Sequence, residues 1–159
     1  MPMQNSKKPR IPFGWLRSII FLLVYLGLVV LAGFLQLDFY TNYTLVFLIS
    51  VLLVAGFSQY IDLISWKEIG LTWNGFALQA GTGFALAIAI LGTGTCFLLA
   101  IDQLNWMEVQ FNGQSFAMSF GLMLLVAFAE ELVFRGYVLR NLRQSLSPVA
   151  ALLVSAALF

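Results

Sequence analysis

Apolar residues along this chain come in four long runs that are separated by short polar segments. The runs occupy residues 18–35, 44–61, 76–99 and a stretch that begins at Phe116. An α-helix rises about 1.5 Å per residue, so about 20 residues cross the roughly 30 Å hydrocarbon core of a bilayer. The pattern therefore predicts an all-α fold, a polytopic transmembrane helical bundle with four full spans.

A fifth apolar run, residues 149–159, reaches the end of the sequence. Ser147 and Pro148, which precede it, are typical of a helix N-cap and a first helical turn. The run is too short to cross the hydrocarbon core, and a terminal carboxylate at that depth would be costly. We expect residues 1–159 to form a single membrane-embedded domain that is truncated at its C-terminus within a fifth span.

The polar segments between the runs indicate the topology. Residues 1–17 form a basic head, and residues 62–74 mix charged and apolar side chains, as an interfacial linker does. The segments 38–42 and 102–114 contain acidic residues but no basic ones, so all 8 Lys and Arg residues fall on one side of the membrane. Basic residues mark the cytoplasmic side. We therefore predict a multi-pass protein of the cell membrane whose N-terminus and Glu-Glu end of span four are cytoplasmic.

Composition narrows the possible classes of function. The chain is 61% hydrophobic and 9% charged, with a mean hydropathy of +0.94, whereas soluble domains are about 45–50% apolar and about 25% charged. The lipid bilayer is therefore an expected partner, and a net charge of +1 gives no reason to expect nucleic acid. Cys96 is the only cysteine and histidine is absent, so we predict no disulfide framework, no metal and no cofactor.

Two adjacent carboxylates and an arginine interrupt the fourth apolar run: Glu130, Glu131 and Arg135. Glu130 lies about 21 Å along the helix from Phe116, some 9 Å inside the cytoplasmic boundary of a core about 30 Å thick. A glutamate at that depth costs roughly 2.5–3.5 kcal/mol unless it faces a wet cavity or a partner. Because α-helical residues advance about 100° each, Glu131 and Arg135 share one face, and Tyr137 shares the face of Glu130.

This spacing predicts that Glu131 pairs with Arg135 while Glu130 projects towards a cavity. A desolvated carboxyl group beside a second carboxylate suits a general base that takes a proton from water and returns it to a leaving group. The other interpretation is structural: Glu131 and Arg135 form an ion pair near a helix end, and Arg140 and Arg143 are ordinary cytoplasmic positive charges. The residues alone leave both interpretations open.

The segment 130–137, EELVFRGY, resembles the first motif, E-E-x-x-x-R followed by Gly-Tyr, of the CPBP (Abi) family of intramembrane, metal-independent glutamic endopeptidases. This family includes the type II CaaX prenyl endopeptidases and bacterial relatives linked to bacteriocin maturation and immunity. The resemblance implies a bundle of about eight helices around a cavity open to the cytoplasm, and a peptide or protein substrate, prenylated or not. It also implies that Glu130 is the general base for the attacking water, with Glu131 and Arg135 supporting it.

Phe159 resembles the Phe that opens the family's second motif, Phe-x-x-x-His. The resemblance places the His of that motif four residues after Phe159, and a third motif, His with Asn or Asp one turn on, later still. These side chains would share the proton and stabilise the oxyanion. We therefore expect the 159 residues to be a fragment that is inactive alone, and a His codon four positions beyond Phe159 would test this.

Two other functions remain open from the sequence. A non-catalytic membrane immunity or scaffold protein would use Glu130, Glu131 and Arg135 as a structural ion-pair network, and would tolerate Glu130→Gln. A small-molecule transporter has less support, because no inverted repeat is visible between the apolar runs.

Overall fold

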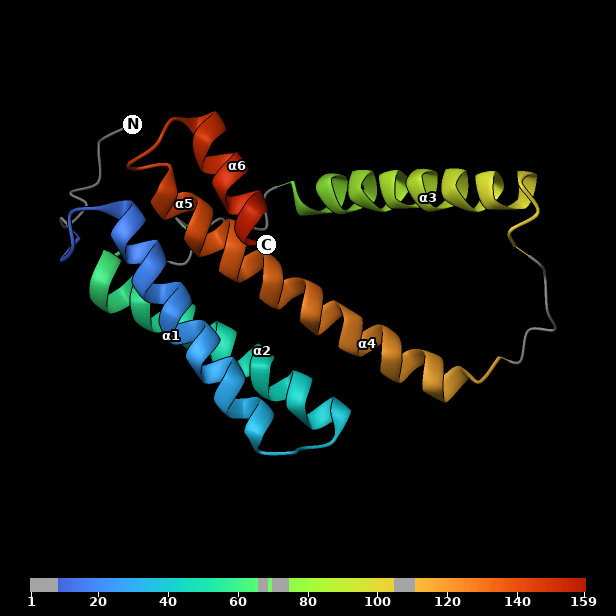
Figure 1. Ribbon diagram of the computed structural model, residues 1–159, viewed down its shortest axis with the longest axis horizontal. Helices are drawn as coiled ribbons and strands as arrows, with labels where there is room; N and C mark the ends of the chain where they lie inside the picture. The colour runs from blue at the N-terminus through green and yellow to red at the C-terminus, as the bar shows by residue number, and fades with distance from the viewer. Residues whose placement is uncertain (1–8, 66–68, 70–74, 105–110) are drawn as a thin grey trace. The chain divides into compact units, whose positions relative to one another are not determined.

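The computed structural model describes residues 9–65, 69, 75–104 and 111–159 of the chain. Regular structure in these ranges is helical (Figure 1). The α-helices are α1 (Gly14–Phe34), α2 (Phe39–Gly56), α3 (Phe76–Ala100), α4 (Gly113–Glu130), α5 (Leu139–Leu142) and α6 (Pro148–Leu158). Two π-helical segments, η1 (Phe57–Asp62) and η3 (Glu131–Val138), continue α2 and α4 directly.

Four helices are long and apolar enough to cross a membrane. They are Gly14–Phe34, Phe39–Asp62, Phe76–Ala100 and Gly113–Leu142, and each corresponds to one of the four predicted runs. The shorter apolar helix α6 corresponds to the predicted fifth run. The prediction of an all-α, multi-pass membrane fold is thus confirmed.

The first two helices begin earlier than the apolar runs predict. α1 begins at Gly14, so Arg17, which the sequence analysis placed in the basic head, lies inside a helix. α2 begins at Phe39 because Asp38 caps it, accepting hydrogen bonds from the Thr41 backbone N–H at 3.1 Å and the Thr41 hydroxyl at 2.6 Å. The predicted polar turn before span two is therefore largely its first helical turn.

α6 begins where the sequence predicts. The Ser147 hydroxyl accepts a hydrogen bond from the Ala150 backbone N–H at 3.3 Å, and Pro148 occupies the first turn. This cap satisfies one of the backbone donors that a helix start leaves without a partner. It fixes where the chain turns into the helix that borders the candidate site.

The predicted interfacial linker, residues 62–74, is described only at residues 62–65 and 69. Asp62 ends η1, and Leu63, with a left-handed φ of 56°, turns the chain out of the helix. Ile69 is buried against Gly136, where an added Cβ would lie 3.0 Å from Ile69 Cγ2. The rest of the linker lies outside the described residues, and its place at the membrane interface stays a prediction.

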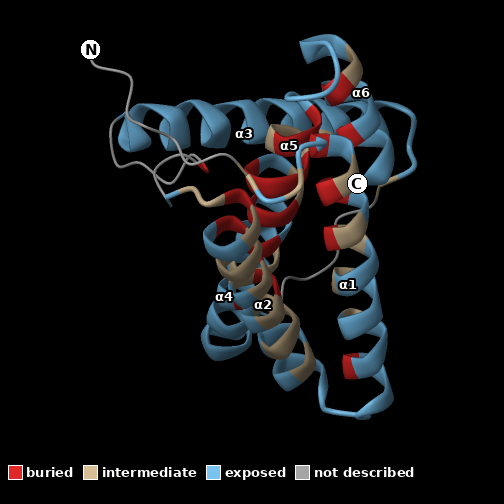
Figure 2. Cartoon of the chain, turned by 90° about the vertical axis from the view of Figure 1, so that its left-hand side faces the viewer, coloured by how far each residue is buried: buried red, intermediate tan, exposed pale blue. Residues whose placement is uncertain are grey.

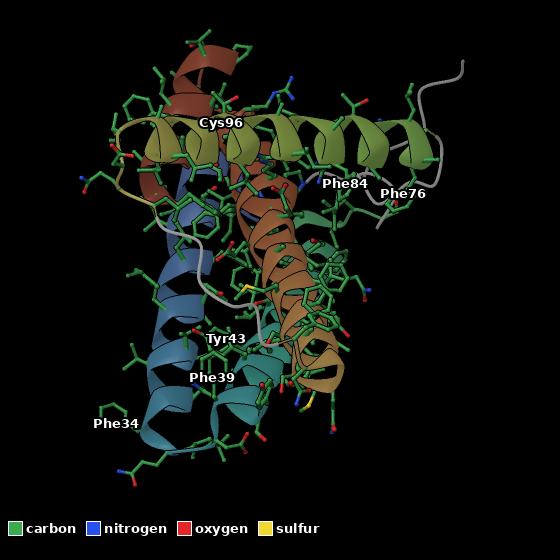
Figure 3. The ribbon with its side chains drawn as sticks, turned by 90° about the vertical axis from the view of Figure 1, so that its right-hand side faces the viewer. Phe34, Phe39, Tyr43, Phe76, Phe84 and Cys96 are labelled. Carbon is green, nitrogen blue, oxygen red and sulfur yellow. The ribbon has the colours of Figure 1, made fainter. Side chains whose placement is uncertain are left out.

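The chain divides into two compact units, one of residues 1–71 with 114–159 and one of residues 72–113. The second unit is built on α3. This helix starts after Gly75, whose φ of 77° is a conformation that glycine adopts without strain. Cys96 is exposed on α3, as are Phe76 and Phe84 (Figure 3).

The core of the first unit lies at one end of its helices. Buried residues gather where the N-terminal half of α1 meets η3 and α5 (Figure 2). The Phe21 ring lies 4.2 Å from the Tyr137 ring and 5.2 Å from the Phe57 ring, centroid to centroid. At the opposite end, near the α1–α2 connection, exposed aromatic side chains such as Phe39 and Tyr43 lie together, 4.8 Å between ring centroids (Figure 3).

Candidate active site

One continuous helical rod, Gly113–Leu142, carries the three predicted site residues. α4 ends at Glu130, and η3 carries Glu131 and Arg135 in π-helical turns. π-Helical turns are rare and occur frequently at functional sites. In this chain the change from α to π turns falls between the two glutamates.

Glu131 and Arg135 form the ion pair that their spacing predicts. The Arg135 Nη1 atom lies 3.0 Å from the Glu131 Oε1 atom. The Arg135 side chain is 74% exposed and the Glu131 side chain 53%. Exposed pairs contribute only about 0–1 kcal/mol to stability, so this pair orients two side chains more than it holds the fold together.

All three predicted site residues line one pocket of about 190 Å³. Glu130, Glu131 and Arg135 make its charged wall. The other lining residues are mostly apolar and come from η3, α5, α6 and the residue after α6: Phe134, Leu139, Leu152, Ser155, Ala156 and Phe159. Carboxylates and an apolar surface therefore face the same small space.

Phe159 lies in this pocket together with the residues of the first motif. Its ring packs edge-on against the Phe134 ring, with centroids 5.3 Å apart and an interplanar angle of 78°. The Ser155 hydroxyl also donates a hydrogen bond to the Phe134 carbonyl at 3.4 Å. α6 therefore packs beside η3, and the two segments that carry the family resemblance meet at the pocket.

Tyr137 does not share the face of Glu130, and that prediction is wrong. Tyr137 is 1% exposed, with its ring against Phe21 in the core, whereas Glu130 is exposed in the pocket. The reason is the π-helical geometry, which the sequence analysis did not anticipate. A π turn holds more residues than an α turn, so each residue of η3 advances by less than the α-helical 100°, and seven residues no longer complete two turns.

The sequence analysis missed the side chains that α6 contributes to the pocket. Leu152, Ser155, Ala156 and Phe159 follow the spacing i, i+3, i+4 and i+7, which places them on one helical face. That spacing was visible in the sequence. Which neighbour this face would contact was not, because it depends on how α6 packs.

The chemistry of the pocket is that of carboxylates and a guanidinium group. Within the described ranges, no three His, Cys, Asp or Glu side chains converge as metal ligands would. Arg135 is engaged by Glu131, and Glu130 makes no ion pair with any described residue. Glu130 is therefore the carboxylate that can accept a proton from a water molecule in the pocket.

Comparison with known families gives one match. Residues 112–159 match the model described as type II CAAX prenyl endopeptidase Rce1-like. No curated protein and no solved structure matches the chain. The matched segment contains α4, η3, α5 and α6, and with them every residue that lines the pocket. Residues 112–159 of this chain are therefore similar to the type II CAAX prenyl endopeptidases, Rce1-like.

Proposed function

We propose that this protein is an intramembrane endopeptidase of the glutamic type, which cleaves a membrane-anchored or lipid-modified peptide with a water molecule activated by Glu130. The observation that carries the proposal is the shared pocket. Glu130, Glu131 and Arg135 line it together with Phe159. The family that residues 112–159 match consists of membrane endopeptidases, which supports a hydrolytic role for this pocket.

Glu130 would act as the general base. It would take a proton from water as the oxygen attacks the peptide carbonyl, and would return that proton to the leaving amine. The sequence holds no histidine, so among these 159 residues Glu130 is our candidate for this step. Glu131 would hold Arg135 in place, and the remaining N–H groups of the Arg135 guanidinium could then bind a substrate carbonyl or carboxylate.

The two walls of the pocket suggest the class of substrate. The charged wall suits the peptide bond, and the apolar wall with Leu152, Ala156 and Phe159 suits an apolar side chain or lipid group beside it. We propose that a prenylated peptide is a better substrate than its unmodified form. Because Arg140 and Arg143 follow the pocket residues, we also propose that this end of the rod, and the N-terminus, lie on the cytoplasmic side.

The test uses membranes that contain the full-length protein. Two fluorogenic peptides serve as probes, a farnesylated peptide ending in a CaaX sequence and the same peptide without the farnesyl group. Wild-type protein should cleave the farnesylated peptide, and Glu130→Gln should lower kcat by about 100-fold or more, since a positioned general base contributes about 10²–10⁴-fold. Glu130→Gln preserves the size and polarity of the side chain and removes only its ability to take the proton.

Asp102→Asn is the matched control, because it makes the same carboxylate-to-amide change at an exposed residue outside the pocket. Its turnover should equal that of the wild type. Undiminished cleavage by Glu130→Gln would remove Glu130 from the mechanism. If the wild-type protein cleaves neither peptide and Glu130→Gln keeps the protein's function in cells, the results favour a non-catalytic membrane protein.

A further inference from the structure

Three buried polar residues from three different helical segments meet outside the pocket. Arg17 of α1 donates from Nη1 to Asp62 Oδ1 at the end of η1, and Asn141 of α5 donates from Nδ2 to Asp62 Oδ2 at 3.3 Å. Arg17 is 1% exposed, Asp62 2% and Asn141 0%. We call these three residues the Arg17 cluster.

Stability alone is a weak explanation for such a cluster. Desolvating two charges is expensive, and replacing a buried ion pair with apolar residues is often neutral or stabilising. The Arg17 Nη2 atom also donates to Gln144 Oε1 at 2.5 Å, so the guanidinium ties α1 to the segment after α5 as well. The cluster therefore fixes how α1, η1 and α5 are placed around one another.

The Arg17 cluster is connected to the backbone of η3. The Asn141 Nδ2 atom that faces Asp62 also donates to the Tyr137 carbonyl at 3.2 Å. Next to it, the Ser18 hydroxyl of α1 lies within hydrogen-bond distance of two carbonyls, that of Val138 at 3.3 Å and that of Gly14 in its own helix at 3.1 Å. Tyr137 and Val138 are the last two residues of η3, so the end of the π-helical segment is held by side chains that α1 and the Arg17 cluster position.

These contacts fall at the end of η3, where the turns change from π back to α. Passing from α to π turns and back changes which carbonyl each N–H reaches, and some backbone groups then depend on other donors. Ser155 of α6 also donates to the Phe134 carbonyl on the pocket side of η3, which accepts from the Leu139 backbone N–H as well. Side chains from α1 and α6, outside the rod, and Asn141 of α5, within it, therefore donate to backbone carbonyls of η3.

We infer that the Arg17 cluster and Ser18 are positioning residues that hold η3 in its π register and so keep Glu130 in the pocket. The inference rests on the proposed function for its catalytic consequence. In an α-helical register, Tyr137 and Glu130 would share a face. Tyr137 is held in the core against Phe21. In the α-helical register Glu130 would therefore face the core side as well, and it would leave the pocket wall that it now forms.

The catalytic arm of the test compares three variants in the complete protein with the farnesylated peptide. Asp62→Asn, which keeps the shape of the side chain and removes its charge, should lower kcat by about 30- to 100-fold with KM within threefold, because a displacement of about 1 Å can cost about 10². Ser18→Ala should lower kcat by about threefold to tenfold for the same reason. Ser50→Ala is the control and should stay at wild-type kcat, since among the described residues the buried Ser50 hydroxyl donates to the Val46 carbonyl of its own helix.

A second arm measures the register without using activity. In a Cys96→Ser background, Val138→Cys reports on the end of η3 and Val54→Cys on α2, and both native side chains are 0% exposed. Reaction with a water-soluble maleimide should be slow at both positions. Adding Asp62→Asn should speed the reaction at Val138→Cys by about tenfold or more and leave Val54→Cys protected, because only η3 opens locally.

Each outcome decides something. Faster labelling at Val138→Cys alone, together with a fall in kcat per folded molecule, supports the inference. Protection at both positions with undiminished kcat in Asp62→Asn overturns it, as does equal acceleration at both positions, which indicates general unfolding. If Asp62→Asn yields no folded protein, the same two measurements on Ser18→Ala support or overturn the inference.

Failure of the proposed function would be seen separately, because the wild type would then not cleave the peptide or Glu130→Gln would remain active. The maleimide labelling would still report on the register of η3 in that case.

Discussion

The two ion pairs formed between described residues of the first unit differ in almost every respect. Glu131 and Arg135 are one helical turn apart, and their side chains are 53% and 74% exposed. Arg17 and Asp62 are 45 residues apart in the sequence, and their side chains are each 1% exposed. The first pair lies in the pocket proposed to be catalytic, and the second lies among the helices that support it.

The cost of losing one charge of an ion pair depends on whether the pair is buried. An exposed pair gains little and loses little, because water screens each charge when the other is removed. A buried pair leaves an uncompensated charge in the protein interior when one partner is removed. We therefore expect substitutions in the supporting pair to affect folding as well as chemistry, and substitutions in the pocket pair to affect chemistry with little effect on folding.

The largest effect should come from breaking the buried pair. Asp62→Leu should lower the free energy of unfolding by about 3–5 kcal/mol, since Arg17 stays buried without its carboxylate. The measurements are the folded yield by gel filtration in detergent and the midpoint of thermal unfolding.

The double variant Arg17→Met with Asp62→Leu is the control for that prediction. It removes both charges and keeps apolar volume, so it should recover most of the lost stability. If the single and double variants are equally unstable, the loss is one of packing and not of an uncompensated charge.

A smaller loss of stability should follow from adding a side chain at Gly14, where the backbone of α1 lies close to the Asn141 carbonyl of α5. At Gly14, an added Cβ would lie 2.0 Å from the Asn141 carbonyl oxygen, a backbone atom that cannot rotate away. Gly14→Ala should destabilise the fold by about 1–3 kcal/mol, as overpacking does. Gly27→Ala on the same helix has open space around the new Cβ and should leave the unfolding midpoint unchanged or slightly raised. Equal midpoints for the two variants would contradict this.

The pocket pair should separate stability from chemistry. Glu131→Gln should change the free energy of unfolding by less than about 1 kcal/mol, because the pair is exposed. Its kcat should still fall by about tenfold to 100-fold, because Arg135 is no longer held in place. Arg143→Gln, at an exposed residue outside the pocket, is the control. A large drop in the unfolding midpoint for Glu131→Gln would mean that the pair supports the fold.

The smallest effect concerns Asp38, a fully exposed carboxylate that belongs to neither ion pair. Hydrogen bonds from the Thr41 hydroxyl and backbone N–H lower the pKa of Asp38 from its ordinary value of 3.8. Because the folded pKa is the lower one, the cap contributes fully above the unfolded value, and its contribution is lost as pH falls through the folded pKa. Amide hydrogen exchange at the first turn of α2 should therefore speed up on acidification below about pH 4 by more than the intrinsic pH dependence of amide exchange accounts for. Asp38→Ala should abolish this extra pH dependence, and its persistence would rule out the cap as the cause.

The sequence was sufficient for features that depend on local or one-dimensional patterns. Span lengths follow from apolar runs, and the start of α6 follows from Ser147 and Pro148. The pairing of Glu131 with Arg135 follows from helical spacing. Each needs only residues that are close together along the chain.

The features that the sequence did not predict depend on residues far apart in the chain. From the sequence, Arg17 is predicted to be one of several cytoplasmic positive charges and Asp62 to begin a linker. In the structure, the packing of α1 against η1 brings the two side chains together. The position of Tyr137 was misjudged because its face depends on π turns. We infer that those turns depend on hydrogen bonds from Ser18 of α1 and Asn141 of α5, neither of which belongs to η3.

By itself, then, the sequence determined the helical spans, the charged group Glu130, Glu131 and Arg135, and the family motif that contains it. Only the tertiary structure decided which face of the rod meets α6, and that Phe159 lines the pocket of Glu130. The physical reason is the difference between the two kinds of interaction. Helix formation and i, i+4 pairing are fixed by neighbouring residues, whereas the register of η3 is fixed by side chains that reach it across the packed core.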